Sequence, residues 1–139
     1  MTATSRASML AAYQMVATHG GVNEADPHRL IVMLMDGALA RIAQARGCME
    51  RKAPAAERSA HLQRALAIVD ELRCSLDLTQ GQLAQNLDSL YDFMSRQLLQ
   101  AHVADKPELL ERVAALLQEI RGAWIALPPA ARALRRDPR

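Results

Sequence analysis

Apolar and polar residues repeat along most of the chain with spacings of three and four, which is the pattern of amphipathic α-helices. The pattern predicts four helices, from 27 to about 51, from about 54 to 76, from about 83 to 101 and from 107 to 127. Their apolar positions, in chain order, are Ile31, Leu34, Met35, Ala38, Ile42, Ala45 and Met49; Leu62, Ala65, Leu66, Val69, Leu72 and Leu76; Leu83, Leu87, Leu90, Met94, Leu98 and Ala101; and Leu109, Leu110, Val113, Leu116, Leu117, Ile120, Trp124 and Leu127. Four such helices with short connections predict an all-α fold, an antiparallel up-and-down four-helix bundle.

Capping residues set the predicted ends of this bundle. Asp26 is a good N-cap for the first helix, and the proline after it suits a first turn, where no backbone N–H is needed. Asp105 and Glu108 have the spacing of a capping box, which predicts the start of the fourth helix. The two prolines at 128–129 end that helix, so the bundle is predicted to span residues 27–127.

Two further segments flank the predicted bundle. Residues 1–26 contain a short amphipathic piece in which Met9, Tyr13 and Val16 share one helical face. A helix of about three turns is marginal in water, so we expect a short, partly ordered extra helical segment that covers part of the bundle surface. Residues 128–139 have no periodic apolar face and predict a basic, disordered tail.

The composition agrees with a helical fold. Half of the 139 residues are apolar but only 3% are aromatic, and the excess of Ala and Leu over β-branched residues excludes a β-sandwich. The net charge of +2 comes largely from the basic tail, so the body lacks the basic face of a nucleic-acid binder. No stretch has the ~18 successive apolar residues of a membrane span, and no signal peptide is visible. We therefore expect a cytoplasmic protein that neither binds nucleic acid nor inserts into a membrane.

Residues that could support catalysis or hold a metal do not form a recognised site. The four histidines lie in unrelated local contexts, and the motifs of nucleophilic hydrolases, zinc peptidases and phosphate loops are missing. Cys48 and Cys74 come late in predicted helices, where the helix dipole disfavours a reactive thiolate. We therefore predict no enzymatic activity, no catalytic residue, no metal and no cofactor.

One alternative function involves His61. The segment from His61 to Ala65 resembles the motif of histidine phosphotransfer domains, which are also helical bundles and carry an exposed histidine, a lysine three residues later and then a glycine. Here Arg64 and Ala65 occupy the last two positions. A histidine on the bundle surface beside an apolar seam, without phosphate chemistry, is the interpretation that the pattern favours.

The predicted helices carry more apolar surface than one core seam requires. Residues 30–35 are all apolar and therefore cover the whole circumference of the first helix. On the third helix, Tyr91 and Phe93 lie off the main apolar stripe. Gly37 is costly inside a helix, which indicates that another helix approaches closely there. Either the N-terminal segment covers this surface, or the surface forms a methionine-rich groove for a partner helix.

Several stretches together resemble the FliS family of flagellar secretion chaperones. Tyr13–Thr18 is similar to the family's N-terminal element, and Asp26–Leu39 is similar to its Ser-Pro, Leu, Met-Leu-Tyr and Gly-Ala-Leu signature. Ser75–Asp77 and Leu83–Leu98 resemble its Ser-Leu-Asp, Asn-Leu, Leu-Tyr and Arg-Arg-Leu segment, and Trp124 also matches in place. The resemblance covers residues 13 to about 127.

Three positions depart from the family pattern. Met35 replaces the signature tyrosine, Asp26 replaces Ser or Thr, and Gln97 replaces the second arginine. Aspartate caps a helix as well as serine does, so the fold is unaffected. The loss of the tyrosine bears on affinity for the partner, or on which partner is bound.

The resemblance implies a cytoplasmic export chaperone that binds the disordered C-terminal segment of flagellin, in a 1:1 complex, and prevents premature polymerisation before type III secretion. It also implies contacts with the flagellar export apparatus, and the apolar surface allows a homodimer when the client is absent. The predicted partner-binding residues are Tyr13, Val16, Leu30, Met33, Leu34, Met35, Gly37, Asn86, Leu90, Tyr91, Met94 and Arg96. Asn86 and Arg96 are the polar candidates that would fix the register of the client. A divergent paralogue with another client, and a purely structural bundle with no client, are the alternatives.

Overall fold

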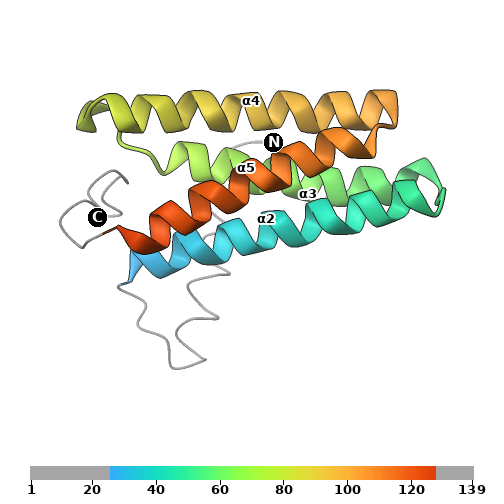
Figure 1. Ribbon diagram of the computed structural model, residues 1–139, viewed down its shortest axis with the longest axis horizontal. Coiled ribbons are helices and arrows are strands. Elements are labelled where there is room, and N and C mark those ends of the chain that lie inside the picture. The colour runs from blue at the N-terminus through green and yellow to red at the C-terminus, as the bar shows by residue number, and fades with distance from the viewer. Residues whose placement is uncertain (1–25, 128–139) are drawn as a thin grey trace.

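The computed structural model describes residues 26–127 as a bundle of helices. The elements are α2 (Pro27–Glu50), α3 (Ala55–Cys74), a short 3₁₀ turn (Leu78–Gln80), α4 (Gln82–Ala104) and α5 (Pro107–Ala126). Figure 1 shows successive helices running in opposite directions along the long axis of the molecule. Each helix packs against the next in sequence, and α5 closes the arrangement against α2. Within residues 26–127, the predicted all-α, up-and-down four-helix bundle is confirmed.

The described residues leave out both flanking segments. The expectations for residues 1–26, apart from Asp26, and for the tail at 128–139 concern positions outside the described range, so they stay predictions.

The first and last helices both begin at the predicted proline, but only the first has the predicted side-chain cap. The Asp26 side chain caps α2, because its Oδ1 accepts a hydrogen bond from the Arg29 N–H at 3.2 Å. The predicted capping box at the start of α5 is wrong. Asp105 instead ends α4 in the left-handed conformation, with a φ of 53°, and Lys106 precedes α5 without a side-chain cap. The chain reverses between Ala104 and Pro107, and aspartate is one of the few residues that tolerate the left-handed turn.

The core confirms the predicted stripe of α2 in full. All of its predicted positions are buried, and Leu34, Met35, Ala38 and Ala45 have no exposed surface. On α3, the predicted stripe is buried apart from the half-buried Leu66. Glu71 is the one charged side chain buried among residues 26–127.

The predicted stripe of α4 is partly wrong. Leu83, predicted as core, is 51% exposed, whereas Ala84 is fully buried. Tyr91, predicted to lie off the stripe, is only 3% exposed. The reason lies in the packing of α4 on α3: ion pairs from Arg73 hold the Asp88 side of α4 against α3. This rotation directs Tyr91 into the core and Leu83 towards solvent.

Candidate partner-binding site

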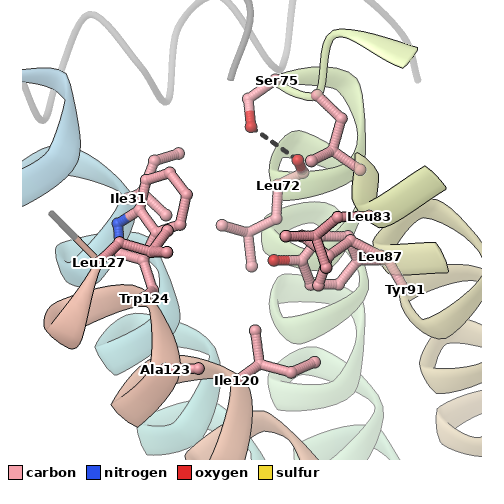
Figure 2. A pocket seen from close by; sticks show the side chains of 11 residues that line it. Ile31, Leu72, Ser75, Leu83, Leu87, Tyr91, Ile120, Ala123, Trp124 and Leu127 are labelled. Carbon is pink, nitrogen blue, oxygen red and sulfur yellow. Dashed lines mark hydrogen bonds between the residues drawn. The ribbon is translucent and has the colours of Figure 1, made fainter. Parts of the chain in front are cut away.

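An apolar cavity of about 110 Å³ lies at the end of the bundle where the N-termini of α2 and α4 meet the C-termini of α3 and α5 (Figure 2). We call it the α4–α5 cavity, because α4 and α5 form its two walls. Its lining residues are Ile31, Leu72, Ser75, Leu76, Leu83, Leu87, Tyr91, Ile120, Ala123, Trp124 and Leu127. None of these residues carries a charged side chain.

The cavity is buried at its base and open at its walls. Ile31, Leu72 and Leu76 belong to the buried core, so they form the base. Leu83 of α4 and Ala123 of α5 are exposed, so the two walls reach solvent on opposite sides of the opening. An open slot between two helices, with an apolar base, is the geometry that accepts a third amphipathic helix.

The polar side-chain groups of the lining are the hydroxyls of Ser75 and Tyr91 and the indole N–H of Trp124, which donates to the His28 carbonyl. The Ser75 hydroxyl is satisfied, since it donates to the Leu72 carbonyl at 2.7 Å (Figure 2). The Tyr91 hydroxyl has no hydrogen-bond partner among residues 26–127, although the side chain is 97% buried. Burial raises the pKa of the Tyr91 phenol, because the phenolate is poorly solvated there. Tyr91 therefore stays a neutral hydrogen-bond donor.

A contact between His28 and Trp124, near the two ends of the described chain, holds one wall of the cavity. We call this contact the clasp. The rings of His28 and Trp124 stack with their centroids 5.0 Å apart and their planes 13° from parallel. The Trp124 indole N–H donates to the His28 carbonyl at 3.1 Å, and His28 Nε2 lies 2.7 Å from the Trp124 carbonyl oxygen. The clasp orients the Trp124 ring and joins the start of α2 to the end of α5. The sequence pattern gave no signal for it, because the two residues are 96 positions apart.

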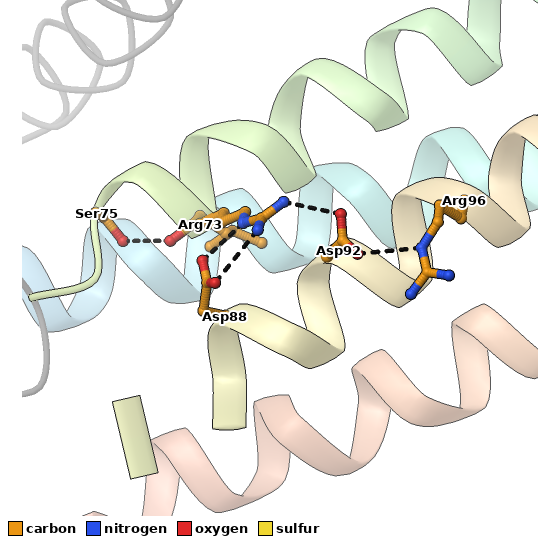
Figure 3. Close-up of polar contacts among 6 residues, drawn as sticks. Arg73, Ser75, Asp88, Asp92 and Arg96 are labelled. Carbon is orange, nitrogen blue, oxygen red and sulfur yellow. Dashed lines mark hydrogen bonds and ion pairs between the residues drawn. The ribbon is translucent and has the colours of Figure 1, made fainter. Parts of the chain in front are cut away.

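A network of ion pairs positions the other wall (Figure 3). The Arg73 guanidinium on α3 binds Asp88 in a bidentate manner, with Nε–Oδ1 and Nη2–Oδ2 distances of 2.6 and 3.2 Å. Its Nη1 also lies 3.0 Å from Asp92, which pairs with Arg96 at 3.1 Å. The hydrogen bond that Arg73 donates to the Asp88 carboxylate raises the pKa of Arg73. These contacts fix the rotation of α4 and hence the direction of Tyr91.

The predicted partner-binding residues fall into separate environments. Those that are buried are Leu30, Leu34, Met35, Tyr91 and Met94; those that are half-buried are Met33, Gly37 and Leu90; those that are exposed are Asn86 and Arg96; and those that lie outside the described residues are Tyr13 and Val16. Of these, Tyr91 lines the α4–α5 cavity. Leu34, Met35 and Met94 have no exposed surface, so a partner can reach them only if the bundle rearranges. Their role in binding stays a prediction.

The predicted polar residues have partners within α4. The Asn86 side-chain oxygen accepts a hydrogen bond from the Gln82 amide at 2.9 Å, and Arg96 pairs with Asp92. Most residues of the cavity lining, including Leu83 and Ile120, are not among the predicted partner-binding residues. Both lie in the predicted helical stripes, and periodicity alone does not distinguish a core position from the edge of an open slot.

His61 does not have the exposed setting of a phosphotransfer histidine. It is half-buried on α3, and its Nδ1 accepts a hydrogen bond from Arg41 of α2 at 3.2 Å. Among residues 26–127, no group of three His, Cys, Asp or Glu side chains is placed to hold a metal ion. Within the same range, no helix has the length and apolar character to cross a membrane.

Comparisons with known proteins place these features in one family. A family model described as flagellar protein FliS matches residues 9–131. The flagellar secretion chaperone FliSB of Pseudomonas aeruginosa is 43% identical over 113 residues, covering 81% of this chain and 89% of the relative. The flagellar secretion chaperones FliS of Salmonella typhimurium and Vibrio cholerae are 39% and 37% identical, covering 90% and 86% of this chain and 93% and 88% of the relatives. The chain therefore belongs to the FliS family of flagellar proteins.

Proposed function

We propose that this chain is a cytoplasmic, non-enzymatic flagellar secretion chaperone. It binds the disordered C-terminal segment of flagellin, one chaperone to one client, and prevents premature polymerisation before type III secretion. The relatives carry the name flagellar secretion chaperone, which supports the general role. The docking of flagellin and its consequence are the proposal.

The observation that carries the proposal is the α4–α5 cavity. It combines a buried apolar base, walls that reach solvent and a lining without charged side chains. Exposed apolar surface favours self-association, so where it persists on a soluble protein it often marks a binding site. A helix with large apolar residues at spacings of three and four would cover both walls at once.

The proposed mechanism requires binding alone. A client segment that folds as it docks loses conformational freedom, at a cost of about 2–5 kcal/mol or more, which offsets part of the gain from apolar burial. The complex is therefore specific while its affinity stays low enough for release. As long as the segment occupies the chaperone, its apolar face is unavailable to other flagellin molecules.

Two leucines of α4 provide a matched test of the docking site. Leu83 and Leu99 are 51% and 53% exposed, but only Leu83 lines the α4–α5 cavity. We expect Leu83→Asp to weaken binding of a synthetic flagellin C-terminal peptide from the same bacterium (the flagellin peptide) by at least about tenfold, because it places a charge against an apolar partner. Leu99→Asp should leave the affinity unchanged.

Isothermal titration calorimetry with the two variants and the parent protein gives affinity and stoichiometry together. Circular dichroism melting checks that both variants fold. Equal affinities for folded Leu83→Asp and Leu99→Asp would exclude the α4–α5 cavity as the docking site. Failure of the parent protein to bind the peptide, or to delay seeded flagellin polymerisation at equimolar concentration, would refute the proposed function itself.

A further inference from the structure

The Tyr91 hydroxyl is the unusual polar group of the α4–α5 cavity. The tyrosine side chain is 3% exposed, and its phenol points into the cavity (Figure 2). Its hydroxyl has no hydrogen bond to any residue between 26 and 127, whereas the other hydroxyl of the lining, on Ser75, is paired at 2.7 Å. The hydroxyl oxygen is not fully enclosed, so water can solvate it through the open side of the cavity in the free protein. A partner that covers the opening without offering an acceptor would leave the hydroxyl unpaired, which is unfavourable. An aromatic core position that needed only bulk would be served by phenylalanine.

The size and chemistry of the cavity restrict what can enter it. A volume of about 110 Å³ has room for one large aliphatic side chain, since apolar cavities of about 150 Å³ hold a benzene molecule. A carboxylate of the occupant would lose its hydration there and find no cation among the lining residues. The acceptor that suits a neutral phenol in this setting is therefore a neutral oxygen.

We propose that Tyr91 is a specificity-determining residue of the client site. Its hydroxyl recognises the client by donating one hydrogen bond to it inside the α4–α5 cavity. A large apolar side chain of the docked client helix fills the cavity, and a neutral oxygen next to it in the client accepts the hydrogen bond from the Tyr91 hydroxyl. That oxygen belongs to a Ser, Thr, Asn or Gln side chain or to a free backbone carbonyl. The inference rests on the proposed function, because it names the chemistry by which the same site selects its client.

The arrangement selects against two kinds of segment. A purely apolar helix would fill the cavity but leave the Tyr91 hydroxyl buried and unpaired, which lowers its affinity. A helix with an acidic residue at the entering position would bury an unpaired charge. Apolar pockets distinguish poorly between segments of similar size. The Tyr91 hydroxyl therefore lets the site distinguish a segment with a suitable acceptor from one of the same size without it.

The first test removes the hydroxyl and keeps the ring. We expect Tyr91→Phe to fold with an unchanged or higher melting temperature and to bind the flagellin peptide about 2- to 12-fold more weakly, which corresponds to one lost hydrogen bond. The matched control is Ser89→Ala, which removes a hydroxyl from the exposed face of the same helix. This control should keep the parent affinity.

The second test observes the hydroxyl directly. The chain has two tyrosines, so labelling tyrosine with ¹³C at Cζ gives two resonances, and Tyr13→Phe assigns them. The Tyr91 Cζ shift reports hydrogen bonding of the phenol, and we expect it to move when the flagellin peptide binds to the full chain. When residues 1–18 are deleted, the Tyr91 resonance should still move on addition of the peptide.

The outcomes separate this inference from the proposed function. If the peptide binds the parent protein but Tyr91→Phe keeps full affinity and the Tyr91 resonance does not move, the hydrogen bond is refuted while the chaperone function stands. If deletion of residues 1–18 moves the Tyr91 resonance and the peptide then has no further effect, the partner of the hydroxyl is the chain's own N-terminal segment, and the inference is wrong. If the parent protein does not bind the peptide, both fail.

Discussion

Two hollows beside α5, each lined by described residues, differ in size and in chemistry. The groove between α2 and α5 (the α2–α5 groove) has a volume of about 350 Å³, and Arg46, Glu50 and Glu111 are among its lining residues. The α4–α5 cavity is smaller, about 110 Å³, and has no charged residue in its lining. The proposal of the α4–α5 cavity as the docking site therefore rests on the chemistry of its lining and not on its volume.

The charges of the α2–α5 groove already satisfy one another. The Arg46 guanidinium lies 2.7 Å from Glu111 on α5 and 3.1 Å from Glu50 on its own helix. Further along the same pair of helices, Arg121 binds Asp36 at 2.6 Å. An apolar partner that covered this groove would have to break or desolvate these ion pairs. The α4–α5 cavity offers the opposite case, since its main polar group lacks a partner within the described chain.

The largest expected effect comes from removing the aromatic wall of the α4–α5 cavity. Trp124→Ala should lower the free energy of unfolding by about 3–5 kcal/mol, because it deletes a buried indole and the stacking with His28 together. Urea denaturation followed by circular dichroism measures the loss. His28→Ala keeps the indole in place and should cost only about 0.5–1.5 kcal/mol, the contribution of an aromatic pair.

Equal losses for Trp124→Ala and His28→Ala would show that the stacking, and not the burial of the indole, holds this end of the bundle. A loss below about 1 kcal/mol for Trp124→Ala would show that the wall is not part of the folding core, contrary to its 6% exposure.

The next expected effect contrasts the two hollows directly. Ala123 lines the α4–α5 cavity and Ala43 lines the α2–α5 groove, and both are exposed. Ala123→Glu should weaken binding of the flagellin peptide by about tenfold or more, because a buried carboxylate there has no cation to pair with. Ala43→Glu adds a charge to a surface that already holds several, so the affinity should stay within about twofold. The reverse result, measured by the same calorimetry, would move the docking site to the α2–α5 groove.

The smallest expected effect concerns the N-terminal segment. We expect deletion of residues 1–18 to raise the association rate of the flagellin peptide severalfold, because a segment that covers the cavity part of the time lowers the fraction of competent molecules. The free chaperone should then also self-associate more, since apolar surface is uncovered. Stopped-flow fluorescence and size-exclusion chromatography measure the two effects. An unchanged or slower association by a folded, monomeric truncation would show that the segment does not cover the site.

The sequence predicted the helices well because their signals are local. The apolar stripe of α2 is continuous and strong, so its buried positions were predicted in full. On α4 the sequence pattern allows two different faces to be buried. Leu83 and Leu90 suggest one face, whereas Ala84 and Tyr91 lie on the face that is buried in the structure. A prediction from the apolar pattern favours the face with more leucines. The face of α4 that is actually buried depends on the ion pairs with α3, which are contacts between residues distant in sequence.

The candidate site was less predictable than the fold for the same reason. Its base comes from α2, α3 and the segment that follows α3, and its walls come from α4 and α5, so no single stretch of sequence contains the α4–α5 cavity. The family resemblance and an apparent position off the core predict Tyr91 as a partner-binding residue. The structure gives it a different setting, as a buried phenol that faces the cavity. Asp105 is a second example of a local pattern that does not determine the structure. Its spacing from Glu108 predicts a helix cap, but Asp105 instead adopts the left-handed turn by which the chain passes from α4 to α5.

The clasp between His28 and Trp124 has a consequence for when the protein becomes functional. Ribosomes release a chain from its N-terminus, and domains fold as soon as their segments are available. His28 emerges early, but its partner follows 96 residues later, so the clasp and the α5 wall form only near the end of synthesis. A nascent chain that has completed α2, α3 and α4 still lacks the slot for a client. The α4–α5 cavity, the proposed client site, therefore forms in the last step of synthesis, and a chain shortened before Trp124 would expose the base of the cavity without its α5 wall.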